Sequence, residues 1–158
     1  MNLNVVTALV LCFAGVLLEA LCAGTGVKKY LSELTWPSFS PPLWAWYTIG
    51  IVYYAIIFVC AYRVLQHPAT DPFRNTALTL LVAVVVLNAA WNVLFFRAKN
   101  LRATFFFSLI YSPVVIACSY CLIEFDTLAA SALGLYALYL IYANVWGYRV
   151  LQLNSRTR

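Results

Sequence analysis

The sequence contains very few charged residues. Asp, Glu, Lys and Arg make up 9% of its 158 residues, whereas hydrophobic residues make up 65%. Soluble domains carry about 25% charged residues, so this chain has too little polar material to cover a soluble surface. The composition therefore predicts an integral membrane protein and excludes a separate soluble domain.

Metal-ligating side chains are scarce as well. The only histidine, His67, lies in a polar loop, and the five cysteines lie in apolar runs, where they behave as small apolar residues. Cys118 and Cys121 form a CxxC pair, but no further ligand lies nearby to complete a metal site. We therefore expect no metal, no cofactor and no disulfide framework. The net charge of +5 is spread over separate loops, which argues against nucleic-acid binding.

Five long apolar runs are present instead. A bilayer-spanning helix needs about 20 apolar residues, and long runs without alternation favour helices over the strands of a barrel. The predicted spans cover residues 3–27, 42–65, 76–96, 103–123 and 128–151. The connections are short, and the first run lacks the basic start and cleavage site of a signal peptide. The predicted fold is an all-α integral membrane protein, a five-transmembrane-helix bundle, with residues 1–158 in a single domain.

The basic residues are distributed unequally between the two ends of this bundle. The side with the first and third loops and the C-terminus carries Lys28, Lys29, Arg97, Lys99, Arg102, Arg149, Arg156 and Arg158, and the other side carries Arg63 and Arg74. Cytoplasmic loops are usually the more basic ones. We therefore expect the C-terminus in the cytoplasm and the N-terminus outside.

A stretch rich in proline and aromatic residues precedes the second span. Residues 36–42 read WPSFSPP, and Trp44, Trp46 and Tyr47 follow. Each proline lacks a backbone donor and favours extended geometry in the residue before it, so residues 36–42 cannot lie inside a helix. The pattern predicts a stiff aromatic loop that leads into a helix and frames a ligand site.

Three of the polar residues inside the predicted spans are candidates for a structural or functional role. Glu19 interrupts the first span, and an acid in the membrane normally faces the bundle interior or a cavity. We interpret it as a protonated carboxyl group hydrogen-bonded to another helix; ligand or proton handling and a position at the interface are the alternatives. Asn88 and Asn92 are four residues apart, so they share one helix face, flanked by Trp91. Bridging between helices and ligand contact both remain open for them.

Three segments carry a family resemblance through their order and spacing. They are PSFSPPLW at residues 37–44, LNAAWNVLFF at residues 87–96 followed by KNL, and the tyrosine-rich last span from residue 136 to its polar, basic tail. In a five-span chain of this length, they resemble the translocator protein family, also called tryptophan-rich sensory proteins or peripheral benzodiazepine receptors. The resemblance covers essentially the whole chain.

The resemblance implies a membrane receptor or carrier that is not an enzyme, is commonly a homodimer, and has a pocket on the cytoplasmic side under the first loop. It implies binding of porphyrins, sterols and benzodiazepine-type ligands, in the mitochondrial outer membrane of a eukaryote or the cell envelope of a bacterium. A planar apolar ligand needs aromatic faces and a cavity between helices, and the carboxylates of a tetrapyrrole suit Lys28, Lys29 or Arg102 at the rim. The residues expected to contact the ligand are Phe39, Trp44, Tyr54, Asn88, Trp91, Tyr136, Tyr139 and Ala143.

The chain departs from the family pattern at several positions. Trp36 replaces a usual lysine, Phe39, Gly50 and Tyr139 replace usual tryptophans, and Asn92-Val93 replaces a proline pair. The missing indoles argue against a porphyrin-degrading photo-oxidative enzyme, which remains the alternative function. A further alternative is a non-catalytic dimeric regulatory membrane protein that dimerises through the small residues at 129–134. The sterol-recognition pattern fails in its strict form because no spacer separates Tyr148 from Arg149.

Overall fold

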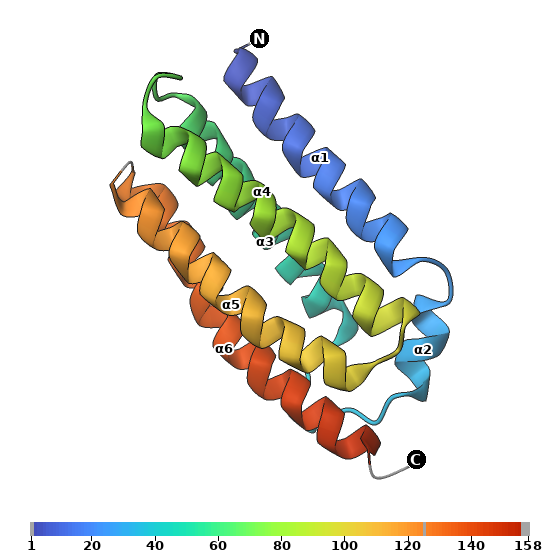
Figure 1. The fold of residues 1–158 in the computed structure, drawn as a ribbon. Coiled ribbons are helices and arrows are strands. Elements are labelled where there is room, and N and C mark those ends of the chain that lie inside the picture. Colours follow the sequence, from blue (N-terminus) through green and yellow to red (C-terminus); the bar gives the residue numbers. More distant parts are fainter. Residues whose placement is uncertain (1, 125, 156–158) are drawn as a thin grey trace.

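A computed structural model describes residues 2–124 and 126–155 of the chain (Figure 1). The helices are α1 (Leu3–Ala23), α2 (Val27–Glu33), α3 (Leu43–Leu65), α4 (Pro72–Asn92), α5 (Leu101–Ile123) and α6 (Thr127–Ser155), with a π-helical turn, η1 (Val93–Arg97), directly after α4. Five segments are long and apolar enough to cross a membrane, namely α1, α3, α4 with η1, α5 and α6. The prediction of an all-α, five-transmembrane-helix membrane protein is confirmed.

Local backbone chemistry shifts several boundaries from their predicted places. The first helix ends at Ala23 rather than at residue 27 because Gly24, with φ of 68°, leaves the helical conformation and its N–H bonds to the Ala20 carbonyl. The expected first loop contains a further short helix, α2. The third span begins at Pro72 rather than at residue 76, since the Asp71 side chain caps it by accepting a 2.9 Å hydrogen bond from the Phe73 N–H.

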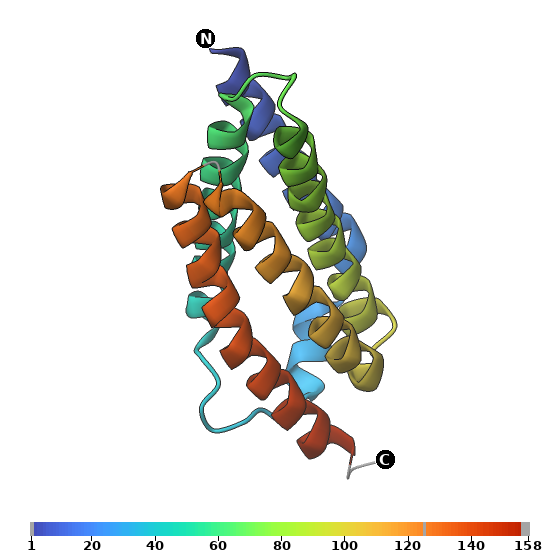
Figure 2. The ribbon, with the colours of Figure 1, turned by 60° about the vertical axis from the view of Figure 1, so that its left-hand side comes forward.

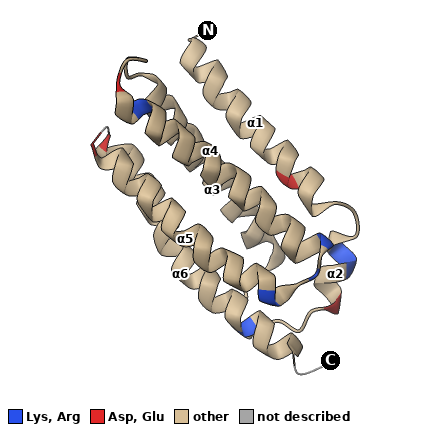
Figure 3. Ribbon diagram, viewed as in Figure 1, with Lys and Arg blue, Asp and Glu red and all other residues tan. Residues whose placement is uncertain are grey.

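The long helices run alongside one another, and α2 lies across one end of the bundle (Figures 1 and 2). Helix α5 packs most extensively against α6, and α1 packs against α3 and α4. Lys and Arg gather at the end of the bundle that α2 covers (Figure 3). Two of the basic residues counted there, Arg156 and Arg158, lie outside the described residues.

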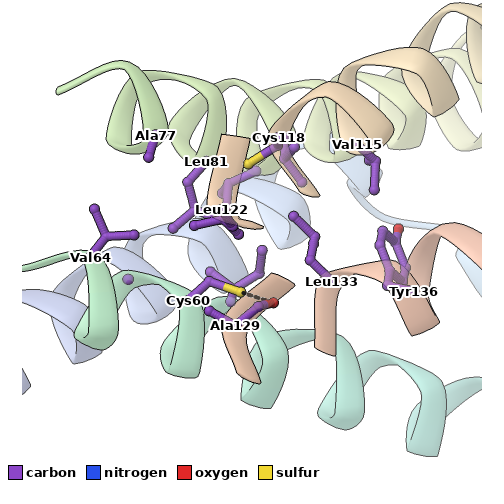
Figure 4. Close-up of a cluster of buried hydrophobic side chains, with 14 of the residues drawn as sticks. Cys60, Val64, Ala77, Leu81, Val115, Cys118, Leu122, Ala129, Leu133 and Tyr136 are labelled. Atoms are coloured by element: carbon purple, nitrogen blue, oxygen red, sulfur yellow. Dashed lines mark hydrogen bonds between the residues drawn. The ribbon is translucent and has the colours of Figure 1, made fainter. Parts of the chain in front are cut away.

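The half of the bundle away from α2 is closely packed. Its core consists of aliphatic and small side chains, among them Ile57, Leu81, Leu122 and Leu133, which are all fully buried (Figure 4). Small residues at the start of α6 let it approach its neighbours closely. Ala129 is fully buried, and its carbonyl accepts a hydrogen bond from the Cys60 thiol at 3.5 Å.

An ion pair joins α3 to the start of α6 at the end of the bundle away from α2. The Arg63 guanidinium bonds to the Asp126 carboxylate, and Asp126 also caps α6 by accepting a 2.9 Å hydrogen bond from the Ala129 N–H. The hydrogen bond from Arg63 lowers the pKa of Asp126 below its usual value. A lowered pKa in the folded protein means that the ionised carboxylate adds stability above about pH 4, and that this stability is lost as the pH falls further.

Two substitutions at Asp126 separate these roles. Asp126→Ala removes both the cap and the ion pair, so we expect a loss of about 1 kcal/mol or slightly more near neutral pH. Asp126→Asn keeps a side-chain acceptor for the cap, so it should lose less stability than Asp126→Ala. It should also lack the part of the acid-induced fall in unfolding temperature that protonation of Asp126 causes. Thermal unfolding between neutral and acidic pH measures both effects. An Asp126→Asn variant with the full acid sensitivity of the wild type would contradict this assignment.

Candidate ligand cavity

The half of the bundle next to α2 encloses a cavity of about 1070 Å³. It is lined by the first part of α3, the last part of α4 with η1, the first part of α5 and the last part of α6, together with Glu19 of α1. Its inner end is a layer of tyrosines where the packed core begins. The Tyr53 and Tyr136 rings are 4.9 Å apart, and the Tyr111 and Tyr136 hydroxyls are hydrogen-bonded at 3.1 Å.

More than a third of the described residues that line the cavity are aromatic. Trp91 stacks on Phe95 of the π turn with centroids 4.7 Å apart and an angle of 15° between the rings. Trp46 of α3 lies 4.9 Å from Trp146 of α6, which in turn contacts Phe95. Large flat side chains that stack along the wall leave open space between the helices, in contrast to the interlocking aliphatic residues of the packed half. The wall therefore offers apolar faces suited to a planar ligand.

A cover made of α2 and the following loop, residues 27–42, closes the outer end of the cavity. The Thr35 backbone and the Asn154 amide exchange two hydrogen bonds, of 2.9 and 3.0 Å. The Trp146 indole N–H donates to the Ser40 hydroxyl at 3.0 Å, and the Tyr142 hydroxyl donates to the Phe39 carbonyl at 3.2 Å. The cover is thus fastened to the end of α6. Within it, residues 37–40 form a turn in which the Ser40 N–H donates to the Pro37 carbonyl at 3.0 Å.

Glu19 forms a polar cluster in the inner wall. Its Oε1 accepts hydrogen bonds from the Tyr54 hydroxyl of α3 at 2.6 Å and from the Asn88 side-chain N–H of α4 at 2.5 Å. The interpretation of Glu19 as hydrogen-bonded to other helices is confirmed. Asn88 therefore bridges two helices and also lines the cavity, whereas Asn92 donates to the Asn88 backbone carbonyl at 3.1 Å.

The structure brings together part of the predicted contact set. Asn88, Trp91, Tyr136, Tyr139 and Ala143 line the cavity. Phe39 instead lines a shallow hollow between the cover and the end of α6. Trp44 lies on the outside with 69% of its surface exposed, and Tyr54 points toward Glu19. With 3.6 residues per turn, Trp44 points roughly 160° away from Trp46 around α3, and Tyr54 points about 100° away from Tyr53.

Several lining residues were not predicted from the sequence. Trp36, Trp46, Tyr53, Phe95 and Trp146 all face the cavity. For α6, a usable signal was present, because Tyr136, Tyr139 and Ala143 continue at the same three- and four-residue spacing to Trp146 and Val150. Phe95 follows the same spacing in α4 and the π turn, because it lies seven residues after Asn88 and four after Trp91.

Charged groups are sparse around the cavity. Lys28 of the cover lines it, but neither Lys29 nor Arg102 does. Among the described residues, no group of three or more His, Cys, Asp and Glu side chains is arranged to hold a metal ion. The site is therefore an apolar, aromatic chamber with one acid in its inner wall and one lysine in its cover.

These features define a class of protein: a five-helix membrane bundle with a covered, aromatic cavity at its basic end. The model of the TspO/MBR family matches residues 7–153, nearly the whole chain. The chain belongs to the TspO/MBR family. A comparison with curated proteins finds no significant match.

Proposed function

We propose that the protein is a membrane receptor or carrier that binds a planar apolar molecule, such as a porphyrin or a sterol-like compound, in this cavity without transforming it. The size of the cavity carries the proposal. Its volume of about 1070 Å³ lies slightly above the roughly 300–1,000 Å³ typical of ligand pockets, so it has room for a large planar molecule. Stacked indole and phenol rings on its wall support a ligand with a flat face, and Lys28 supports one that carries a carboxylate.

The five tryptophans provide a direct readout of binding. Trp36, Trp46, Trp91 and Trp146 line the cavity, whereas Trp44 faces outward. Titration with protoporphyrin should therefore quench most of the tryptophan fluorescence in a saturable way. Trp91→Ala removes a stacking face, so it should weaken binding by about tenfold or more. Absence of saturable quenching would overturn the proposal.

Trp44→Ala is the matched control, because it removes an indole outside the cavity and should leave the dissociation constant unchanged. The same titration in light and in darkness separates binding from the enzymatic alternative. Loss of the Soret band of the porphyrin that requires both light and protein would indicate photo-oxidation by the tryptophans of the wall rather than simple binding.

We also propose an orientation, a membrane and an oligomeric state for the protein. The basic residues at the covered end support a cytoplasmic position for the cavity mouth, with the protein in the mitochondrial outer membrane or a bacterial envelope. The apolar outer surface of the bundle would contact the lipid bilayer. We also propose that the protein forms a homodimer. Ala129 and Ala130 at the start of α6 are buried within the chain itself, so a dimer interface would use other residues, such as the exposed apolar faces of the spans.

A further inference from the structure

Glu19 is an acid within the membrane that has no cationic partner. The described residues contain two ion pairs, Arg63 with Asp126 and Lys99 with Glu33, and neither involves Glu19. Both hydrogen bonds to Glu19 reach Oε1, so Oε2 accepts none from any described residue. A carboxylate away from water is costly unless its charge and its lone pairs are satisfied. Because Glu19 lines the cavity, a bound ligand has access to this group.

The surroundings of Glu19 suit a positively charged ligand group. Trp91, Tyr136 and Tyr139 also line the cavity, and aromatic faces attract cations through their negative ring faces. The Tyr53 hydroxyl, at the inner end of the cavity, is buried and makes no hydrogen bond with the described residues. Among the described residues that line the cavity, Lys28 is the only basic one, and it belongs to the cover at the opposite end.

We propose that Glu19 makes the inner end of the cavity a subsite for a protonated nitrogen, so that the cavity prefers planar aromatic ligands that carry an amine over neutral ligands of the same shape. This inference rests on the proposed function, because it requires the cavity to hold a ligand. In the complex the Glu19 carboxyl group has released its proton to water, so that the ionised Oε2 accepts the ligand N–H while Tyr54 and Asn88 donate to Oε1. The carboxylate is then held from both sides, and the ring system of the ligand lies against the aromatic wall.

The test compares 9-aminoacridine, a cation near neutral pH, with acridine, which is neutral there and has the same three-ring plane. Binding is measured by tryptophan quenching of the full chain in phosphatidylcholine nanodiscs, with empty nanodiscs subtracted. The wild type should bind 9-aminoacridine at least about tenfold more tightly, the effect of one charge-assisted hydrogen bond. Glu19→Gln keeps an acceptor for Tyr54 and Asn88 but removes the charge, so the preference should fall to about twofold or less. Glu33→Gln, an acid outside the cavity, should retain the full preference.

Protoporphyrin titration of the same samples distinguishes the two proposals. If protoporphyrin binds but the wild type holds both acridines equally or holds neither, the subsite is overturned while the proposed function stands. A Glu19→Gln variant that keeps the preference also overturns the subsite. If neither protoporphyrin nor the acridines bind, the proposed function itself fails. Should Glu19→Gln not fold, the wild-type preference still decides, since equal affinities contradict the subsite without any variant.

Discussion

Replacing Trp146 by alanine is expected to destabilise the protein by about 3–5 kcal/mol, the typical cost of removing a buried large aromatic side chain. Only 5% of Trp146 is exposed. Its ring centroid lies 5.6 Å from that of Trp36 of the cover and 4.9 Å from that of Trp46 of α3. Its indole N–H donates a hydrogen bond to the Ser40 hydroxyl. The substitution therefore leaves a void at the point where three segments meet and releases the cover. Thermal unfolding followed by thiol labelling measures the loss, because Cys60 and Cys118 are free and fully buried.

Two further variants identify the cause of this loss. Trp146→Phe keeps a ring but cannot donate to Ser40, so it should fall between the wild type and Trp146→Ala. Trp44→Ala removes a tryptophan that is 69% exposed and should lower the unfolding temperature only slightly. Equal losses in Trp44→Ala and Trp146→Ala would show that indole removal in general, rather than the closure of the cavity, determines the stability.

Gly15→Ala is expected to destabilise the contact of α1 with α3 and α4 by about 1–3 kcal/mol, the usual cost of overpacking. A Cβ atom at Gly15 would lie 2.8 Å from Val85 Cγ1 and 3.0 Å from both Cε1 and the hydroxyl of Tyr54. Tyr54 has little room to move, since its hydroxyl also bonds Glu19 at 2.6 Å. The methyl group therefore forces α1 outward or breaks the Glu19 cluster. Thermal unfolding measures the loss, and the preference for 9-aminoacridine reports on the cluster.

Gly134→Ala is the matched control in another span. The nearest atom to its added Cβ is Ser119 Oγ, at an ordinary contact distance of 3.6 Å. Glycine in a helix is about 0.5–1 kcal/mol less favourable than alanine, so Gly134→Ala should be neutral or slightly stabilising. A Gly15→Ala variant as stable as Gly134→Ala would mean that α1 adapts freely, and the close approach at Gly15 would then have no structural role.

The sequence predicts the helices better than it predicts the site. Runs of apolar residues are local, so the five spans follow from neighbouring positions, although the start of α4 at Pro72 and the short helix α2 at Val27–Glu33 were missed. Cavity residues depend on which face of each helix turns inward. The polar and aromatic pattern of α4 and α6 marks Asn88, Trp91 and Tyr136 correctly as lining residues. In α3, nearly every residue is apolar or aromatic, so no pattern distinguishes Trp44 from Trp46.

Hydropathy and charge add up along the chain, and they alone are enough to specify a membrane protein with five spans and one strongly basic end. One half of the bundle is closely packed and the other contains the cavity. This difference arises only when helices distant in sequence pack against one another. Ile57, Leu81 and Leu133 belong to the buried core at one end, while Trp46, Trp91 and Trp146 line the cavity at the other. The partners of Glu19 are decided in the same way: Tyr54 and Asn88 are 35 and 69 residues away, so only the packing of α1 against α3 and α4 brings a carboxyl group and its two donors together.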